Sequence, residues 1–485
     1  NTAVGYQALS ANTTGAQNTA MGEGSLLTNS TGSHNTALGR SALYSATTAD
    51  YNTAVGSGAM YAATTGAQNV AVGRNALNAV TTGGSNVAIG YQALDAITTV
   101  SQLTAIGHGA LGANTTGTGN VAVGYLAGNT LTTAANTTAI GYEALTALTT
   151  GSNNTAVGKE AAEATTTGAS NTAVGKSALA TNSTGDSNTA VGKGALETNA
   201  ASNNTAVGAS ALEANTTASN NTAVGKSALL SNTTGDENVA VGAESLEANT
   251  TGTDNTALGY QALEANTTAS NNTGLGRAAL KANTTGANNT AVGYTALFYN
   301  TTAANNTAVG YAALQANTTG DTNVAVGKDS MIVNTTGTNN TAVGARTLQA
   351  STTGANNVAV GDLALGANTT ADGNTAVGTS ALDANTIGGL NVGVGYLALT
   401  ANTEGSYNTA VGTSALATAT TAGRNTAVGY VALTANTSGL YNSSVGAWSS
   451  YSNTTGANNT AMGYVALYAN TTGSNNTAIG YGSLD

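Results

Sequence analysis

The sequence contains no cysteine and no proline, and it has only one phenylalanine and one tryptophan among its 485 residues. Without cysteine there can be no disulfide, no thiolate metal ligand and no cysteine nucleophile. Charged residues make up 7% of the chain, against roughly 25% in an ordinary globular protein. Hydrophobic residues still reach 41%, so the composition is not that of a disordered chain. We therefore expect a fold built from small residues, without an aromatic core.

Positive charge is also scarce, because 11 Lys and Arg stand against 22 Asp and Glu, a net charge of −11. The few cations are scattered and form no basic patch, which argues against binding to nucleic acid through its phosphates. No run of 18 apolar residues occurs, so we expect no membrane insertion in this segment. The chain begins at the first residue of a repeat and without an initiator Met. We therefore expect it to be a segment of a longer chain.

What the sequence has in abundance is a repeat seventeen residues long. Copies begin at Asn1 and at every seventeenth residue to Asn188, then at Asn204 and at every seventeenth residue to Asn476, which makes 29 copies with a single one-residue deletion. A stacked solenoid requires such constant spacing, because each coil must lie in register on the previous one. The sequence predicts an all-β parallel β-solenoid, a β-roll or β-helix, of about 29 coils with seventeen residues per coil. We expect residues 1–485 to form a single continuous domain.

Individual positions of the repeat, numbered 1 to 17 from here on, indicate how a coil is built. Position 5 is Gly in every copy and predicts a sharp corner, because only Gly adopts positive φ without steric cost. Position 4 is always Val, Ile, Leu or Met and position 9 is Leu or Met in 26 copies, and we interpret both as facing inward. Strands are expected at positions 1–4 and about 7–11, before a turn at Asn-Thr-Thr-Gly. Position 12 is Asn in 19 of 28 copies but elsewhere includes Val80, Ile97 and Leu131, which indicates an interior ladder of amides.

Positions 3 and 8 hold small residues, mostly Ala, and their orientation has two interpretations. If positions 4 and 9 face inward, strand alternation points positions 3 and 8 outward, where two Ala ladders would form a flat apolar strip for packing against another copy. We favour this interpretation; the alternative is that the Gly corner resets the alternation and places Ala inside a thin coil. Position 6 is Tyr in 11 copies and Lys or Arg in eight. We expect this row on the surface, either covering the corner backbone, which we favour, or stacking on sugar rings.

No residues assemble into a recognisable active site, and we expect no catalytic, cofactor-binding or metal-binding residues, no cofactor and no enzyme activity. His34 and His108 occupy different repeat positions and lack acidic or cysteine companions at the spacing of metal ligands. Among the many Asn-x-Thr sequences, those with Asn at position 17, such as Asn153 and Asn288, are the better candidates for glycosylation. Carboxylates recur at position 10 and are expected to form an exposed, solubilising column: Glu197, Glu213, Glu247 and Glu264.

The stretch Asn86-Val87-Ala88-Ile89-Gly90 and its counterparts along the whole chain resemble the Asn-Ser-Val-Ala-Ile-Gly repeat in the head domains of trimeric autotransporter adhesins. Similar repeats occur in phage tail-fibre-like proteins. In the adhesin family the head is a parallel β-roll of three chains on the bacterial surface, which binds host matrix or other cells. The resemblance implies a core residue at position 4 and a corner at position 5. The repeat here is longer, however, and it comes without a neck, a coiled-coil stalk or a membrane anchor.

These observations favour a non-catalytic structural or adhesive extracellular fibre or filament, at the cell surface or on a virion, that mediates attachment or assembly. We expect self-association, lateral or end to end and including a trimer, with a glycan or another surface molecule as a candidate ligand. An ice-binding β-solenoid is the alternative, because positions 2, 13 and 14 supply Thr columns. Against it, positions 13 and 14 would point to opposite faces and position 2 is often Val. A polysaccharide-processing β-helix is a weaker alternative, because no copy carries an inserted loop.

Overall fold

The computed structural model describes all 485 residues, and each of its regular elements is a β-strand of three residues. The chain is an all-β parallel β-solenoid without helices, in which each repeat forms one coil. The predicted fold class is therefore confirmed. The chain divides into two compact units, Asn1–Asn238 and Val239–Asp485, which are described separately.

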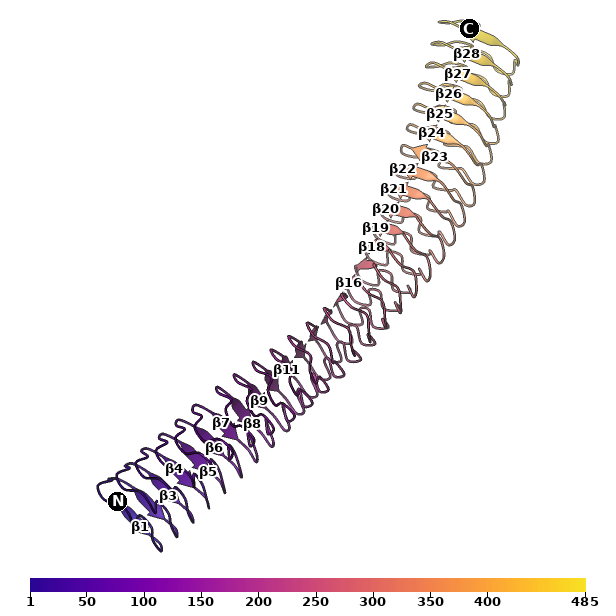
Figure 1. Cartoon of the computed structure of the whole chain (residues 1–485). Helices are drawn as coiled ribbons and strands as arrows, with labels where there is room; N and C mark the ends of the chain where they lie inside the picture. Colours follow the sequence, from indigo (N-terminus) through magenta and orange to yellow (C-terminus); the bar gives the residue numbers. More distant parts are fainter. The chain divides into compact units, whose positions relative to one another are not determined.

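The first unit contains fourteen strands, each at positions 2–4 of its coil. Consecutive strands pair in parallel, and the register places each residue beside its equivalent in the next coil, as with Thr2 and Thr19. Figure 1 shows these coils stacked one on the next from β1 onward. The strands are β1 (Thr2–Val4), β2 (Thr19–Met21), β3 (Thr36–Leu38), β4 (Thr53–Val55), β5 (Val70–Val72), β6 (Val87–Ile89), β7 (Thr104–Ile106), β8 (Val121–Val123), β9 (Thr138–Ile140), β10 (Thr155–Val157), β11 (Thr172–Val174), β12 (Thr189–Val191), β13 (Thr205–Val207) and β14 (Thr222–Val224).

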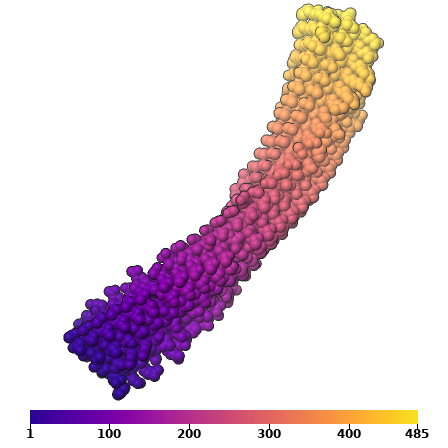
Figure 2. Space-filling view, viewed as in Figure 1, coloured from indigo at the N-terminus to yellow at the C-terminus, as the bar shows by residue number.

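The second unit repeats this arrangement with fifteen strands in the same parallel register. Within each unit, the side chains of successive coils lie in continuous contact on the face that Figure 2 shows. The strands are β15 (Val239–Val241), β16 (Thr256–Leu258), β17 (Thr273–Leu275), β18 (Thr290–Val292), β19 (Thr307–Val309), β20 (Val324–Val326), β21 (Thr341–Val343), β22 (Val358–Val360), β23 (Thr375–Val377), β24 (Val392–Val394), β25 (Thr409–Val411), β26 (Thr426–Val428), β27 (Ser443–Val445), β28 (Thr460–Met462) and β29 (Thr477–Ile479).

Each strand ends at the Gly corner that the sequence predicts. The φ angle at position 5 is positive in every coil, from 117° to 142°. A Cβ atom on Gly5 would lie 2.7 Å from the carbonyl carbon of Gly22 in the next coil. Position 5 therefore requires Gly both for its backbone conformation and because the coils approach each other too closely for a side chain.

The second strand predicted at about positions 7–11 does not form. Positions 7 and 9 adopt left-handed backbone conformations, as at Gln7 with φ 56° and Leu9 with φ 54°, which an extended strand excludes. The segment is instead a series of tight turns bonded from coil to coil, where the Leu26 N–H donates to the Ala42 carbonyl at 3.0 Å. A non-Gly residue in this conformation costs about 1–2 kcal/mol, so the inter-coil hydrogen bonds and the packed interior must offset that cost.

The interior of each coil is lined by small residues, which corrects the favoured interpretation of the Ala ladders. Ala at position 3 and position 8 is fully buried, as at Ala37 and Ala42, whereas position 4 points outward. The alternative, with Ala inside, is right. In a strand of three residues only the central side chain faces inward, and the left-handed turns at positions 7 and 9 let the adjacent positions 8 and 9 both point in. Leu43, at position 9, is fully buried as predicted.

Two columns of buried amides run through the coils. At position 12 the predicted ladder is confirmed, because Asn29 Nδ2 donates to Asn12 Oδ1 at 2.9 Å and to the Gly32 carbonyl at 3.0 Å. Position 1 forms a second ladder, which the repeat pattern alone does not predict. There the Asn18 backbone N–H donates to Asn1 Oδ1 at 2.8 Å, and Asn18 Nδ2 donates to the same Gly32 carbonyl at 2.8 Å. Both amide columns therefore converge on the backbone carbonyl of position 15.

The position-12 ladder stops wherever a neighbouring coil lacks Asn. Asn114 lies between coils that carry Ile97 and Leu131 at this position, and neither atom of its buried amide has a hydrogen-bond partner. At the ends of the ladder the amide oxygens have no donor, because the following coil carries Ala or Ser: Asn29, Asn334 and Asn402.

Candidate functional site

The most extensive candidate site is the outer surface of the strands. Each strand points its position-2 and position-4 side chains outward, and position 4 remains 38% exposed at Ile89 and 41% exposed at Leu258. Position 2 is Thr, Val or Ser, position 4 is Val, Ile, Leu or Met, and no coil places a charge at either position. Because the register is residue on residue, the side chains form two parallel rows. We call this surface, positions 2 and 4 of all strands in a unit, the strand face.

The strand face is large for an exposed apolar surface. Strands lie about 4.8 Å apart and three residues span about 10 Å, so fourteen strands present roughly 650 Å² in the first unit alone. The largest apolar patch of an ordinary monomer is about 300–600 Å² and is often functional. The strip of outward-facing Ala expected at positions 3 and 8 does not form, and the exposed strip consists instead of the side chains at positions 2 and 4.

The surface residues at position 6 stack on one another in columns. The longest column has four rings with a cation at each end, and its ring centroids are 5.2 Å apart with planes within 13° of parallel. The terminal cations lie 5.2 and 5.4 Å from the end rings. Because the ring faces cover each other, a sugar ring has no free face to stack on within the column. Its members are Arg74, Tyr91, His108, Tyr125, Tyr142 and Lys159.

This packing favours the interpretation in which position 6 covers the corner backbone. The cation at one end of the column is also held in its charged form. Glu160 Oε1 lies 3.0 Å from Lys159 Nζ and accepts its hydrogen bond, which raises the pKa of that ammonium group. Position 6 is thus an exposed row, as predicted, and most of its aromatic rings stack on the ring of an adjacent coil.

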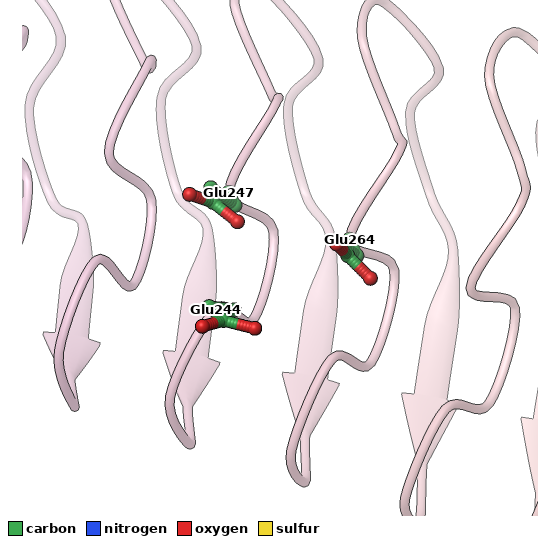
Figure 3. Close-up of side chains that lie close together, drawn as sticks. All are labelled: Glu244, Glu247 and Glu264. Carbon is green, nitrogen blue, oxygen red and sulfur yellow. The ribbon is translucent and has the colours of Figure 1, made fainter.

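The position-10 carboxylates are half-buried, so the expectation of an exposed column is wrong. In the second unit, Glu247 and Glu264 at position 10 and Glu244 at position 7 offer oxygens that lie within 4.8 Å of one another (Figure 3). Such a group of carboxylates could hold a cation. However, Lys281 Nζ already lies 3.0 Å from Glu264 Oε2, and Gln261 Nε2 donates to Glu244 at 2.9 Å. The positive charge of Lys281 and the hydrogen bond from Gln261 offset the repulsion between the three carboxylates, so no bound cation is needed to explain why they lie close together.

The remaining residues singled out from the sequence lie apart from one another. His34 stacks on Tyr51 with centroids 4.7 Å apart, and His108 belongs to the aromatic column described above. Asn153 and Asn288 are exposed, and both have left-handed φ, 63° and 60°. Asn tolerates this conformation better than most residues, which explains its frequency at position 17 without any modification.

The comparisons with known proteins add no family to these observations. No protein-family model matches the chain, and no curated protein matches it. The structure has no helix with the length and apolarity that crossing a bilayer requires. The chain is a β-solenoid repeat protein, and its function has to be argued from its surfaces.

Proposed function

We propose that the chain belongs to a non-catalytic extracellular fibre, at a cell surface or on a virion, whose copies associate laterally through the strand face. The observation that carries this proposal is the uninterrupted, charge-free surface at positions 2 and 4 of every coil. The resemblance to the trimeric adhesin heads supports the same proposal and makes three chains the expected number.

Lateral association through the strand face fits both its area and its chemistry. Roughly 650 Å² per unit approaches the about 800 Å² that each partner contributes to a standard interface. The surface is flat and identical from coil to coil, so a second copy offers a matching surface at the same spacing. Because no charge is present on it, burial of the strand face carries no penalty for desolvating an ion.

The test is to place charge on the strand face and measure the mass of the particle in solution. Val343 and Val377 occupy position 4 of strands β21 and β23 in the second unit, and each is 37% exposed. We expect the wild-type chain to form oligomers by size-exclusion chromatography with light scattering. The double variant Val343→Lys/Val377→Lys should dissociate to monomers, since an interface that buries two ammonium groups without partners is strongly destabilised.

A matched control carries the same charge elsewhere. The double variant Tyr294→Lys/Tyr311→Lys lies at position 6, where Arg277 and Lys328 occur naturally in the coils on either side, and it should leave the oligomer intact. Circular dichroism would establish that all variants keep the β-fold. A wild-type chain that remains monomeric at high micromolar concentration would contradict lateral association.

Ice binding is the second candidate, and one observation favours it. Position 2 is Thr in 21 of 29 coils, and it shares the flat strand face with a row of methyl-bearing side chains at a regular spacing. The position-13 column does not contribute, because its hydroxyls donate within the solenoid, as Thr47 Oγ1 does to the Thr64 carbonyl at 3.2 Å. Thermal hysteresis that is present in the wild type and absent in Val343→Lys/Val377→Lys would show that the protein binds ice through the strand face, and would contradict the fibre proposal.

A further inference from the structure

The backbone N–H of position 16 has a defined partner in many coils, the side chain at position 16 of the next coil. In five coils that partner is an Asp, whose Oδ1 accepts the hydrogen bond at 2.6 or 2.7 Å. In other coils a Ser hydroxyl takes its place, as Ser33 does for Ala16 at 3.0 Å. The solenoid thus shows repeatedly that the space beside this N–H accepts a carboxylate oxygen. The five Asp residues are Asp50, Asp186, Asp236, Asp321 and Asp372.

Beside Ser406 no side chain is present to accept this hydrogen bond, because position 16 of the next coil is Gly423. A Cβ atom on Gly423 would lie 2.8 Å from the Ser406 carbonyl oxygen and 3.6 Å from its nitrogen, so a side chain fits at this position only if the two coils move slightly apart. The missing side chain leaves a surface hollow of about 240 Å³, lined by Ser406 and Gly423 among others. The Ser406 N–H therefore faces an open hollow instead of a carboxylate.

A preorganised cation forms one wall of the hollow. The Arg424 guanidinium lies between the rings of Tyr407 and Tyr441, at 5.6 and 5.4 Å from their centroids, and its Nη1 donates to the Tyr441 hydroxyl at 2.7 Å. Stacking covers the two faces of the guanidinium but leaves its remaining N–H groups free at the edge, in the geometry that carboxylates bind. All three residues line the hollow. Since the side chain is already held in place, a ligand loses little free energy in ordering it.

We propose that this hollow binds the carboxylate of an acidic sugar unit. The ligand carboxylate takes the place of the absent Asp side chain, with one oxygen on the Ser406 N–H and the other on Arg424. Glu404 and Thr421 line the same hollow and bind the hydroxyl groups of the ring, the Glu404 carboxylate as acceptor. The volume is below the about 300 Å³ of the smallest ordinary ligand pockets, so it fits a single unit. This inference rests on the adhesive part of the proposed function, but the site lies within one chain and does not need lateral association.

The first unit offers a matched position without the cation. Gly84 likewise places no side chain beside Ala67, and its Cβ would lie equally close, 2.8 Å, to the Ala67 carbonyl oxygen. The neighbouring position-17 residues are Gln68 and Ser85, which hydrogen-bond each other at 3.3 Å. No Arg stands there, so the same substitution at Gly84 tests whether any effect is specific to the hollow at Gly423.

The test is calorimetric titration of the whole chain with glucuronate, with glucose and with propionate. We expect glucuronate to bind at least tenfold more tightly than either of the others. Gly423→Asp should reduce glucuronate affinity at least tenfold, because its own carboxylate fills the site as in the five coils above. Arg424→Gln should do the same by removing the cation, and Gly84→Asp should have no effect. Asp is a native residue of position 16, and neither Gly423 nor Gly84 has the positive φ of the corner glycines. Both Asp variants should therefore fold once the adjacent coil shifts by a few tenths of an ångström to relieve the 2.8 Å contact of the new Cβ.

Two results would overturn the proposal. If glucuronate binds equally well to Gly423→Asp and Arg424→Gln, it does not bind in this hollow. If propionate binds as tightly as glucuronate, the hollow recognises a carboxylate but not a sugar ring. Light scattering on the same samples measures the oligomeric state independently, so that a missing ligand and a missing lateral assembly give different results.

Discussion

Asn114 illustrates at the residue scale how strongly one side chain depends on its counterparts in the adjacent coils. Most Asn residues of position 12 have a partner one coil away, as Asn300 has in both Asn283 and Asn317. Asn114 instead lies between coils with apolar residues, and its amide is buried without any hydrogen bond. An unpaired buried polar group of this kind costs about 1–3 kcal/mol. The same residue type is thus stabilising in one coil and destabilising in another.

Replacing this amide should stabilise the protein. We expect Asn114→Leu to raise the midpoint of denaturant unfolding, by the equivalent of about 1–3 kcal/mol, because it removes the unpaired amide and continues the apolar row of Ile97 and Leu131. The matched variant Asn300→Leu should lower the midpoint, because it removes the donor to Asn283 Oδ1 and one of the two acceptors of Asn317 Nδ2, which keeps only the Gly320 carbonyl. Similar losses in both variants would show that the amide of Asn114 is satisfied in solution.

Stability should also respond to pH through Asp95. Burial raises the pKa of the Asp95 carboxyl group above its ordinary value, so the folded chain holds this proton more tightly than the unfolded chain. The contribution of Asp95 to stability is therefore fully present at low pH and is lost as the pH rises through the raised pKa. We expect Asp95→Asn to melt at a higher temperature than the wild type at pH 7, with the difference vanishing in acid. A difference that is constant with pH would contradict this effect.

At the scale of the coil, the sequence predicts the period, the Gly corner, the inward Leu and the position-12 ladder, because each is a residue type that recurs once per coil. The orientation of positions 3 and 4 could not be predicted in this way. Alternation along two strands predicts position 4 inside and position 3 outside, whereas left-handed residues at positions 7 and 9 replace the second strand. A signal was available in the Gly residues at position 7, such as Gly24 and Gly58, and in the Asn residues at position 17. The position-1 ladder also had a signal, since Leu103 replaces Asn there.

The hollow at Gly423 is the part of the molecule that sequence reasoning could not reach. Its basis is a side chain that is absent from one coil, and its wall comes from residues one coil apart on either side, Tyr407 and Tyr441. Which positions of successive coils face each other becomes known only when the coil path is known. The strand face cannot be predicted for the same reason, although the residue types at positions 2 and 4 are plain in the sequence.

The corner itself permits a direct test of the coil geometry. Gly276→Ala should destabilise the second unit by several kcal/mol, because the new Cβ would lie 2.6 Å from the Gly293 carbonyl oxygen at a φ of 131°. Gly482→Ala is the control, since nothing lies within 4 Å of its Cβ, and its left-handed φ should cost only about 1 kcal/mol. Equal unfolding midpoints for the two variants would refute close contact between successive corners.

At the scale of the whole molecule, the number of chains in the proposed fibre can be counted by weight. The chain has a mass of 46.8 kDa in 29 coils, or about 1.6 kDa per coil. With about 4.8 Å per coil, one chain weighs about 0.34 kDa per Å of axis and three chains about 1.0 kDa per Å. We expect mass-per-length measurement by scanning transmission electron microscopy to give the value for three chains. The single-chain value along an isolated filament would exclude lateral association.

Because each coil meets its neighbours through equivalent positions, a whole repeat can be gained or lost without creating a new kind of contact. Unequal recombination between such similar repeats would then yield shorter or longer proteins that still fold. Related genes should therefore differ in length by whole repeats. The length of the solenoid is then a property that selection can change without changing the stability of each coil.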